Sequence, residues 1–267
     1  TLHKVPVDFI TTPFIIIKLI FITHKNYINK LKIYKLDEIM SIVVNNISKT
    51  IGQQKIISKI NFEANPGDIV GILGPNGAGR STIMKTITGL YTQTDGDIYI
   101  CGKETITNRI FTQSKIGYLS EENPLYQDMY VVEFLEFICD IHEIKYHNCN
   151  PIIQLTGLQK VKNQKINTLS KGFKQRVGIA QALIHNPDVI ILDEPTSGLD
   201  PQQLIEIRNI ITNLGRDKTI LLSTHIMQEI EAMCNRIIII NNGELLANKK
   251  IEEFNDNIMD DFLQLIK

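Results

Sequence analysis

The sequence has no excess of charge of either sign. It carries 28 lysine and arginine residues against 29 aspartate and glutamate residues, a formal net charge of -1. Proteins that bind nucleic acid through its backbone rely on a surplus of positive charge to displace counterions. The near-zero net charge therefore argues against a nucleic-acid partner. Any phosphate that this chain binds must be bound by groups of a local site.

The sequence also lacks a long apolar run. The most apolar stretch, residues 14–22, is interrupted by Lys18, whereas a membrane-spanning helix needs about 20 mostly apolar residues. We expect that the chain does not cross a bilayer alone. Any work at a membrane then needs a partner that supplies the span.

Closely spaced cysteines are missing as well, since no CxxC pair is present for a metal or redox site. We interpret all four cysteines as reduced thiols of a cytoplasmic chain, namely Cys101, Cys139, Cys149 and Cys234. With 43% hydrophobic and 21% charged residues in a chain of 267, the composition is that of one or two globular domains and excludes a mainly disordered protein.

Residues 1–40 differ in composition from the rest of the chain. They are rich in Lys, Ile, Asn and Tyr, follow no clear helical or strand period, and contain the first methionine only at Met40. Two interpretations are open, a membrane-surface arm or translated upstream sequence that is not part of the native product. The second is favoured, because Ile, Lys and Asn have A/T-rich codons and position 1 is not Met.

From Ile42 onward the sequence indicates an α/β domain. Short apolar runs typical of parallel strands covered on both faces begin at Ile69, Val189 and Ile220. Helical patterns follow the first two runs, and Asp200-Pro201 supplies the N-cap and first turn of the second helix. The apolar positions of these two helices are Ile83, Ile87 and Leu90, then Leu204, Ile207, Ile211 and Leu214. Buried strands separated by helices predict a three-layer fold, which a hairpin at residues 237–247 extends.

Helical patterns replace the buried strands between about residues 120 and 185. The apolar residues of one helical face there are Val131, Phe134, Leu135, Ile138 and Ile141. We interpret this part as a helical insertion in the α/β core. The expected organisation is one domain over residues 41–267, with a helical subdomain at about 120–185 and a short C-terminal tail after about residue 248.

A glycine-rich turn follows the first buried run and opens a helix. Its spacing, GxxxxG followed by a basic residue and Ser, is that of a phosphate-binding loop, whose backbone N–H groups and helix N-terminus face the phosphates. The candidate binding residues are Gly74, Pro75, Asn76, Gly77, Ala78, Gly79, Arg80, Ser81 and Thr82. Ser81 would hold Mg²⁺, but Arg80 stands where the motif has Lys, and a planar guanidinium does not replace a compact ammonium. An ordinary strand-to-helix turn is the alternative for this loop taken alone.

Two carboxylates, Asp193 and Glu194, end the second buried run. Ligands of α/β proteins bind at the carboxyl ends of parallel strands, so Asp193 can reach the Mg²⁺ and Glu194 can polarise an attacking water. Either residue alone is compatible with a plain turn. Both together, after a phosphate-binding loop, favour nucleotide hydrolysis.

Three further motifs occur in the order typical of one family. The segment LSKGFKQR at residues 169–176 resembles the LSGGQ signature of ABC ATPases. Residues 197–200 look like the D-loop of that family, and residues 223–225 look like its switch-histidine segment. With the phosphate-binding loop and the paired carboxylates, these motifs extend across nearly all of residues 42–245. By resemblance, the chain is identified as a member of the ABC ATPases.

The resemblance implies a P-loop NTPase fold of the ABC type, with a RecA-like α/β core, an antiparallel β subdomain and an inserted helical subdomain. It implies a head-to-tail dimer, with itself or with a sister ATPase, that sandwiches two ATP molecules. Glu194 would be the general base, His225 would contact the γ-phosphate, and Ser81 and Asp193 would hold Mg²⁺. The residues that would act on the partner's nucleotide are Ser170, Lys171, Gly172 and Asp200.

The residues after Ile116 narrow the subfamily. In the segment GYLSE, Glu121 takes the place of the Q-loop glutamine, and this form is similar to multidrug and natural-product exporters, most closely the gliding-motility-associated ABC ATPase. The resemblance implies that Glu121 binds ATP and that a transmembrane permease subunit docks near residues 121–141. An ordinary surface loop and core helix are the alternative for this segment. The chain would be cytoplasmic and peripheral on the inner face of the cell membrane, powering export.

Two departures from the family bear on activity. Besides Arg80, Ile51 stands where the family has an aromatic residue that stacks on adenine. We expect ATP to bind while hydrolysis is slow, so an ATP-binding switch or decayed ATPase is the alternative to a transport motor. DNA-repair and chromosome-organising ATPases are excluded, because Arg80 and Ser170 stand too close in the chain for the long coiled coil between these motifs. A translation-factor ATPase would carry two cassettes, whereas this chain has one.

Overall fold

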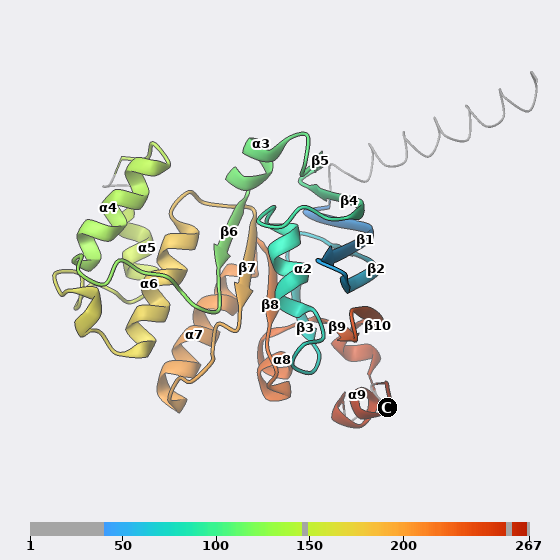
Figure 1. Ribbon diagram of the computed structural model, residues 1–267. Helices are drawn as coiled ribbons and strands as arrows, with labels where there is room; N and C mark the ends of the chain where they lie inside the picture. The colour runs from blue at the N-terminus through green and yellow to red at the C-terminus, as the bar shows by residue number, and fades with distance from the viewer. Residues whose placement is uncertain (1–39, 146–148, 255–257, 266–267) are drawn as a thin grey trace, which may run out of the picture. The chain divides into compact units, whose positions relative to one another are not determined.

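The structure is a computed structural model that describes residues 40–145, 149–254 and 258–265. Residues 1–39, for which the sequence leaves two interpretations, lie outside the described residues. In the part that follows, strands form two sheets, and helices cover or join them (Figure 1).

The larger sheet has six strands in the order β10-β9-β3-β8-β7-β6. Neighbouring strands from β9 to β6 run parallel, and β10 is antiparallel to β9. Every residue of β3, β7 and β8 is buried, as the three apolar runs predict. The strand bounds are β3 Ile69–Leu73, β6 Ile116–Leu119, β7 Val189–Asp193, β8 Thr219–Ser223, β9 Arg236–Asn241 and β10 Glu244–Lys250.

The smaller sheet has four antiparallel strands in the order β2-β1-β4-β5. Their bounds are β1 Ile42–Ile51, β2 Gln54–Ala64, β4 Asp95–Ile100 and β5 Lys103–Glu104. Ile42 pairs with Ala64 on one side and with Ile100 on the other, so β1 forms the middle of this sheet. One face packs on the rest of the domain, which explains why only part of each strand is buried.

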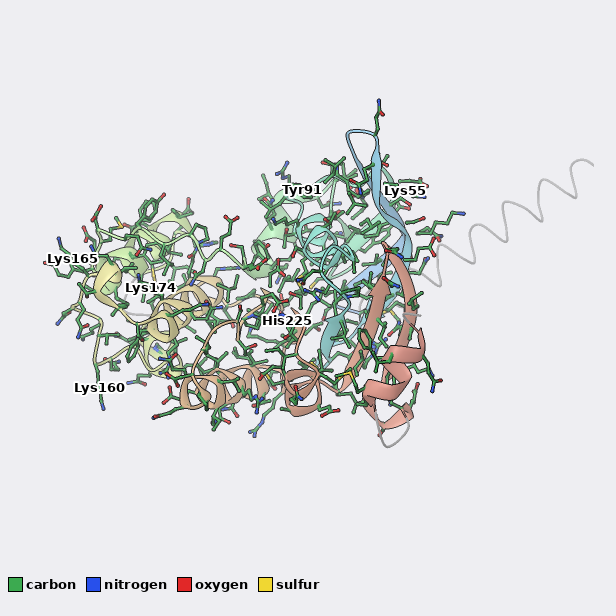
Figure 2. All side chains as sticks on the ribbon, turned by 60° about the horizontal axis from the view of Figure 1, so that its bottom comes forward. Lys55, Tyr91, Lys160, Lys165, Lys174 and His225 are labelled. Carbon is green, nitrogen blue, oxygen red and sulfur yellow. A yellow bond between two sulfur atoms is a disulfide. The ribbon has the colours of Figure 1, made fainter. Side chains whose placement is uncertain are left out.

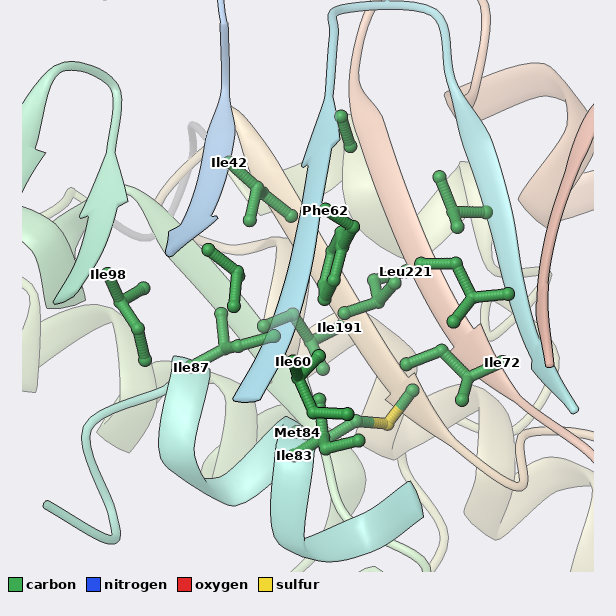
Figure 3. Packing of buried hydrophobic residues seen from close by; sticks show 14 of the residues in the cluster. Ile42, Ile60, Phe62, Ile72, Ile83, Met84, Ile87, Ile98, Ile191 and Leu221 are labelled. Atoms are coloured by element: carbon green, nitrogen blue, oxygen red, sulfur yellow. The ribbon is translucent and has the colours of Figure 1, made fainter. Parts of the chain in front are cut away.

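Helix α2 (Arg80–Ile87) lies between the two sheets. Figure 3 shows its Ile83, Met84 and Ile87 facing the strands of both sheets, and these side chains are fully buried. Because β3 feeds directly into α2, this packing fixes the connecting loop over the carboxyl edge of the larger sheet. The helix ends at Ile87, and Leu90, expected on its apolar face, is 57% exposed. Gly89, with φ +75°, turns the chain before Leu90 is reached.

The opposite face of the larger sheet packs against helices α6 (Lys171–Leu183), α7 (Pro201–Leu214) and α8 (Met227–Met233). Side chains alternate along each buried strand, so Ile190 faces these helices while Ile191 faces the α2 side. Two helix-covered faces make the predicted three-layer α/β fold.

Helices α4 (Val131–Ile141) and α5 (Asn150–Leu155) pack with α6 around a separate apolar cluster, drawn at the left of Figure 1. Ile141 was expected on the buried face of α4 but is 60% exposed, because it is the last residue before the His142 cap. Cys139 and Cys149 belong to this cluster and form a disulfide. The expectation of four reduced thiols is therefore wrong for these two, since the end of α4 and the start of α5 bring them together.

The remaining elements are short. They are α3 (Arg109–Ser114), the 3-10 turns Ile166–Thr168 and Ile251–Glu253, and α9 (Ile258–Leu265). Among the helices of the described residues, none is long and apolar enough to cross a membrane.

Candidate functional site

The loop between β3 and α2 has the backbone of a phosphate-binding loop. Gly77 and Gly79 adopt φ +81° and +103°, a left-handed conformation that favours glycine. Gly79 is the N-cap of α2, and no side chain caps the helix there. A Cβ at Gly79 would also lie 2.8 Å from Ile57 Cγ2. The first-turn N–H groups of α2 are thus left available for an anion.

A cavity of about 620 Å³ opens over this loop. Residues from five separate parts of the chain line it, namely Gln54, Ile56, residues 75–82, Glu121, Glu194, Ser197 and His225. Glu121 reaches it from the loop after β6. Ile51, which replaces the expected aromatic residue, is 47% exposed at the end of β1, and the strand side of the cavity is formed by Gln54 and Ile56 instead.

Asp193, at the end of β7, is held by two hydroxyl groups. Ser81 Oγ donates to Asp193 Oδ1 over 3.2 Å, and Ser223 Oγ donates to the same oxygen over 2.5 Å. The carboxyl group is 1% exposed, and among the described residues no cationic side chain forms an ion pair with it. A buried carboxylate without a cationic partner is costly. Together with the hydroxyl oxygen of Ser81, it provides the hard oxygen ligands that suit Mg²⁺.

Glu194 is held from both sides. Arg80 Nη2 lies 2.9 Å from Glu194 Oε1, and His225 Nδ1 lies 3.0 Å from Glu194 Oε2. The backbone N–H of Glu194 donates to Ser223 Oγ over 3.0 Å, and its φ of +51° is unusual for a residue with a side chain. This backbone turns the carboxylate toward the phosphate-binding loop.

The guanidinium of Arg80 therefore links the phosphate-binding loop to Glu194. Its Nη1 donates to the carbonyl oxygen of Gly74 while its Nη2 pairs with Glu194. A lysine has one ammonium group and cannot present two parallel donors in this way. The sequence identifies Arg80 as a departure, but it gives no sign of the pair with Glu194, which lies far away in the chain. The sequence likewise indicates Ser223 only as part of a motif, whereas in the structure its hydroxyl group bonds both the carboxylate of Asp193 and the backbone N–H of Glu194.

The signature residues lie elsewhere. Ser170 caps α6, where its Oγ accepts from the backbone N–H of Phe173 over 3.4 Å, and Asp200 caps α7, where it accepts from Gln203 over 2.9 Å. A Cβ at Gly172 would lie 2.5 Å from Gln203 Cδ, so the two helix starts are packed together. Lys171 extends over Gly198, within 2.2 Å of the position that a Cβ there would take.

Gly172 and Asp200 line a second cavity, of about 460 Å³, and neither lines the one over the phosphate-binding loop. Figure 2 shows His225 between the strand side of the protein, which carries Lys55, and the helical side, which carries Lys160 and Lys174. The structure therefore brings the loop, Glu194, Glu121 and His225 to one cavity, with Asp193 bonded to Ser81 beside it. Gly172 and Asp200 line the other cavity, and Ser170 and Lys171 lie at the start of α6 without lining either one.

Tyr118, which lines a groove of about 330 Å³ together with Asp193, keeps its hydroxyl group buried without a hydrogen-bond partner in the described residues. Burial raises the pKa of this phenol, and the nearby carboxylate of Asp193 raises it further. The phenol therefore stays protonated around neutral pH.

Comparison with known proteins agrees with this geometry. Residues 57–197 match the family model described as ABC transporter. The lantibiotic transport ATP-binding protein SrtF of Streptococcus pyogenes is 34% identical over 210 residues, which are 78% of this chain and 90% of that protein. The bacitracin transport ATP-binding protein BcrA of Bacillus licheniformis is 37% identical over 204 residues, 75% of this chain and 67% of that protein.

Among solved structures, the dimeric ATP-binding cassette MJ0796 bound to ADP and Pi superposes with a TM-score of 0.72 and 26% identity, covering 80% of this chain and 100% of that one. The α/β fold, the phosphate-binding loop and the paired carboxylates are thus found together with a matching family model and close relatives. The chain belongs to the ABC transporter family, as an ATP-hydrolysing ATP-binding subunit.

Proposed function

We propose that this chain drives export as a head-to-tail dimer that closes on two ATP molecules. The observation that carries the proposal is the separation of two half-sites on one chain. The loop and Glu194 line one cavity, and Asp193 is bonded to Ser81 beside it. Ser170 caps α6 and Gly172 lines a different cavity at the start of that helix. A second chain, a copy or a sister ATPase, would bring its signature helix to the first cavity.

The residues of the first cavity have separate tasks in this proposal. Backbone N–H groups at residues 77–82 and the start of α2 bind the phosphates. Ser81 and Asp193 hold Mg²⁺, which when bound neutralises charge on the phosphates. Glu194 orients and deprotonates the attacking water, and His225 contacts the terminal phosphate. Catalysis here consists of positioning and charge neutralisation.

The signature of the second chain completes the site. Ser170 presents a hydroxyl group at the N-cap of α6, and the backbone N–H groups of that helix start would face the partner's phosphate. Asp200 and Lys171 lie next to it and would contact the partner's loop. Each chain supplies half of each site, which makes hydrolysis depend on dimer formation.

A transmembrane permease subunit would dock at residues 121–141. Support comes from a groove of about 330 Å³ that Leu90, Tyr118 and residues 119–124 help to line. Beside it, the exposed rings of Tyr126 and Phe137 pack edge to face, with centroids 5.7 Å apart. Exposed aromatic residues next to a groove are typical of a protein interface. Docking of this kind would place the chain on the inner face of the cell membrane.

The proposed subfamily is the multidrug and natural-product exporters. Support comes from the GYLSE and LSKG segments and from relatives named for lantibiotic and bacitracin transport. A role in gliding motility rests on the resemblance of the loop sequence alone. It stays a prediction that the named relatives do not support.

A complementation assay tests the proposed function. Glu194→Gln and Ser170→Arg should each abolish Mg-ATP hydrolysis by the full chain. Mixed together, the two inactive proteins should regain activity, because one of the two composite sites then has an intact Glu194 and an intact Ser170. Melting curves of both variants check that each is folded.

Failure of the mixture to hydrolyse ATP, with both variants folded and the wild type active, would refute the head-to-tail arrangement. A wild type that binds ATP without turnover would instead favour the alternative function, an ATP-binding switch. The specific observation behind that alternative is the pairing of Glu194 with Arg80.

A further inference from the structure

Arg80 and Glu194 form an almost fully buried ion pair across the site. Their side chains are 10% and 6% exposed, and Arg80 Nη2 lies 2.9 Å from Glu194 Oε1. Water therefore screens this attraction only weakly, and a charge-assisted hydrogen bond of this kind is among the stronger ones in proteins.

The pair leaves Glu194 occupied on both oxygens. Oε1 accepts from Arg80, and Oε2 is within hydrogen-bond distance of His225 Nδ1 at 3.0 Å. A general base needs a carboxylate oxygen that faces the water it activates. In this arrangement Glu194 faces the guanidinium of Arg80 instead.

Arg80 is also the cation that a nucleotide would need. Among the described residues that line this cavity, it is the single lysine or arginine, beside two carboxylates, Glu121 and Glu194. In a phosphate-binding loop the basic residue reaches the β- and γ-phosphates. The γ-phosphate of ATP and Glu194 must then compete for the same guanidinium.

We propose that the Arg80–Glu194 pair is a latch that the γ-phosphate opens. ATP draws Arg80 away from Glu194 and so releases the general base only when a hydrolysable phosphate is present. ADP lacks that phosphate and leaves the pair closed. Arg80 thus contacts the γ-phosphate and, by leaving Glu194, frees the general base; the inference rests on the proposed ATP site.

The latch should weaken ATP binding by a measurable amount. Part of the binding energy of the γ-phosphate is used to break the ion pair, so ATP binds more weakly than it would without the pair. Removing the charge of Glu194 should therefore strengthen binding of ATP far more than binding of ADP. The gain should depend on the presence of Arg80.

Nucleotide affinity of the full chain, measured in EDTA so that no hydrolysis occurs, tests this directly. Four proteins form a double-mutant cycle: wild type, Arg80→Lys, Glu194→Gln and the double variant. We expect Glu194→Gln to tighten ATP binding about tenfold in the Arg80 protein and less than about threefold in the Arg80→Lys protein. ADP affinity should change less than about threefold in every case.

Glu121→Gln is the matched control. It removes a carboxylate from the same cavity, and no ion pair with Glu121 is found among the described residues. It therefore measures how ATP affinity changes when a carboxylate of this cavity becomes an amide and no ion pair is broken. The gain in ATP affinity from Glu121→Gln should be smaller than the gain from Glu194→Gln. Light scattering during the titrations ensures that all proteins are compared in the same oligomeric state.

Equal gains from Glu194→Gln with and without Arg80, or a gain no larger than that of Glu121→Gln, would overturn the latch while leaving the ATP site intact. Binding of neither nucleotide by any of the proteins would overturn the proposed function and the latch together. A switch of this kind can also be relieved by one substitution. In an assay in which Glu194→Gln abolishes ATP hydrolysis, Arg80→Lys should therefore raise the hydrolysis rate above that of the wild type.

Discussion

The imidazole rings of His142 and His185 stack with centroids 4.3 Å apart and planes inclined by 9°. His142 caps the end of α4, and His185 follows α6 and bonds through Nε2 to the carbonyl oxygen of Ile116 at 2.9 Å. The stack therefore connects the helical cluster to the start of β6. It joins the proposed permease-docking segment to the sheet that carries the site.

This stack predicts a loss of stability in mild acid. Burial lowers the pKa of both imidazoles, and for His185 the neighbouring His142 and Lys218 lower it further, partly opposed by the bond to Ile116. The unfolded chain then binds protons at a higher pH than the folded chain. The free energy of unfolding should be largest above about pH 6.5 and fall as the pH drops below that value.

Urea unfolding at several pH values measures the effect. Circular dichroism is the suitable signal, because the sequence contains no tryptophan. His142→Phe keeps an aromatic ring on His185 but does not titrate, so its stability should fall less steeply between about pH 7 and pH 5. Equal slopes for the variant and the wild type would show that the stack does not cause the loss.

Cys139 and Cys149 provide a second prediction. Without reductant, a denatured sample should show two free thiols per chain, from Cys101 and Cys234, and four after reduction. Denaturation is needed because burial raises the pKa of both free thiols and slows their reaction in the folded protein. Reduction should lower the free energy of unfolding by about 2–3 kcal/mol, since the bond closes a short loop. Four thiols before reduction would contradict the pairing.

A third prediction concerns the connection between α7 and α8. Arg208 binds Glu229 through two nitrogens, at 3.0 and 2.7 Å, and Glu229 is 1% exposed. Arg208→Met should cost about 3–5 kcal/mol of unfolding free energy, because it leaves a buried carboxylate without its cation. The double variant Arg208→Met with Glu229→Leu should recover most of that loss, since no charge is then buried.

The exposed pair Lys250–Glu252 is the control for this measurement. Its side chains are 61% and 76% exposed, so Lys250→Ala should change stability by less than about 0.5 kcal/mol. A similar small effect for Arg208→Met in urea unfolding would mean that Glu229 is stabilised by something other than Arg208.

Much of the fold could be predicted from short stretches of sequence. The runs that form β3, β7 and β8 are apolar at every position, and such runs have few alternatives to a strand covered on both faces. The N-cap at Asp200 could also be predicted from a short stretch of sequence, because its hydrogen-bond partner Gln203 is only three residues away. Where the pattern failed, at Leu90 and Ile141, a helix ended before the apolar period did.

The contacts that distinguish this site could not be predicted in that way. Arg80 and Glu194 are far apart in the chain and meet because β3 and β7 lie on either side of β8, so their loops reach the same edge. Cys139 and Cys149 meet for a similar reason, at the junction of two helices. Motif spacing identified which residues take part, whereas side-chain pairing depended on the packed structure.

Two glycines of the phosphate-binding loop have different roles, since Gly74 is required for close packing and Gly77 faces the nucleotide cavity. A Cβ at Gly74 would lie 2.3 Å from the carbonyl oxygen of Ile240 in β9, whereas nothing lies within 4 Å of a Cβ at Gly77. Gly74→Ala should therefore cost about 2–3 kcal/mol of unfolding free energy, because the backbone of the sheet must move. Gly77→Ala should cost about 1–2 kcal/mol, the strain of a side chain at φ +81°.

Urea unfolding without nucleotide compares the two variants, and titration with ATP in EDTA compares their binding. Gly77 lies in the turn whose N–H groups face the cavity, so Gly77→Ala should lose more ATP affinity than its loss of stability accounts for. Gly74→Ala should bind ATP in proportion to its folded fraction, because its added methyl group contacts β9 rather than the cavity. If Gly74→Ala were as stable as the wild type, close packing against Ile240 could not be the reason for glycine at the start of this loop.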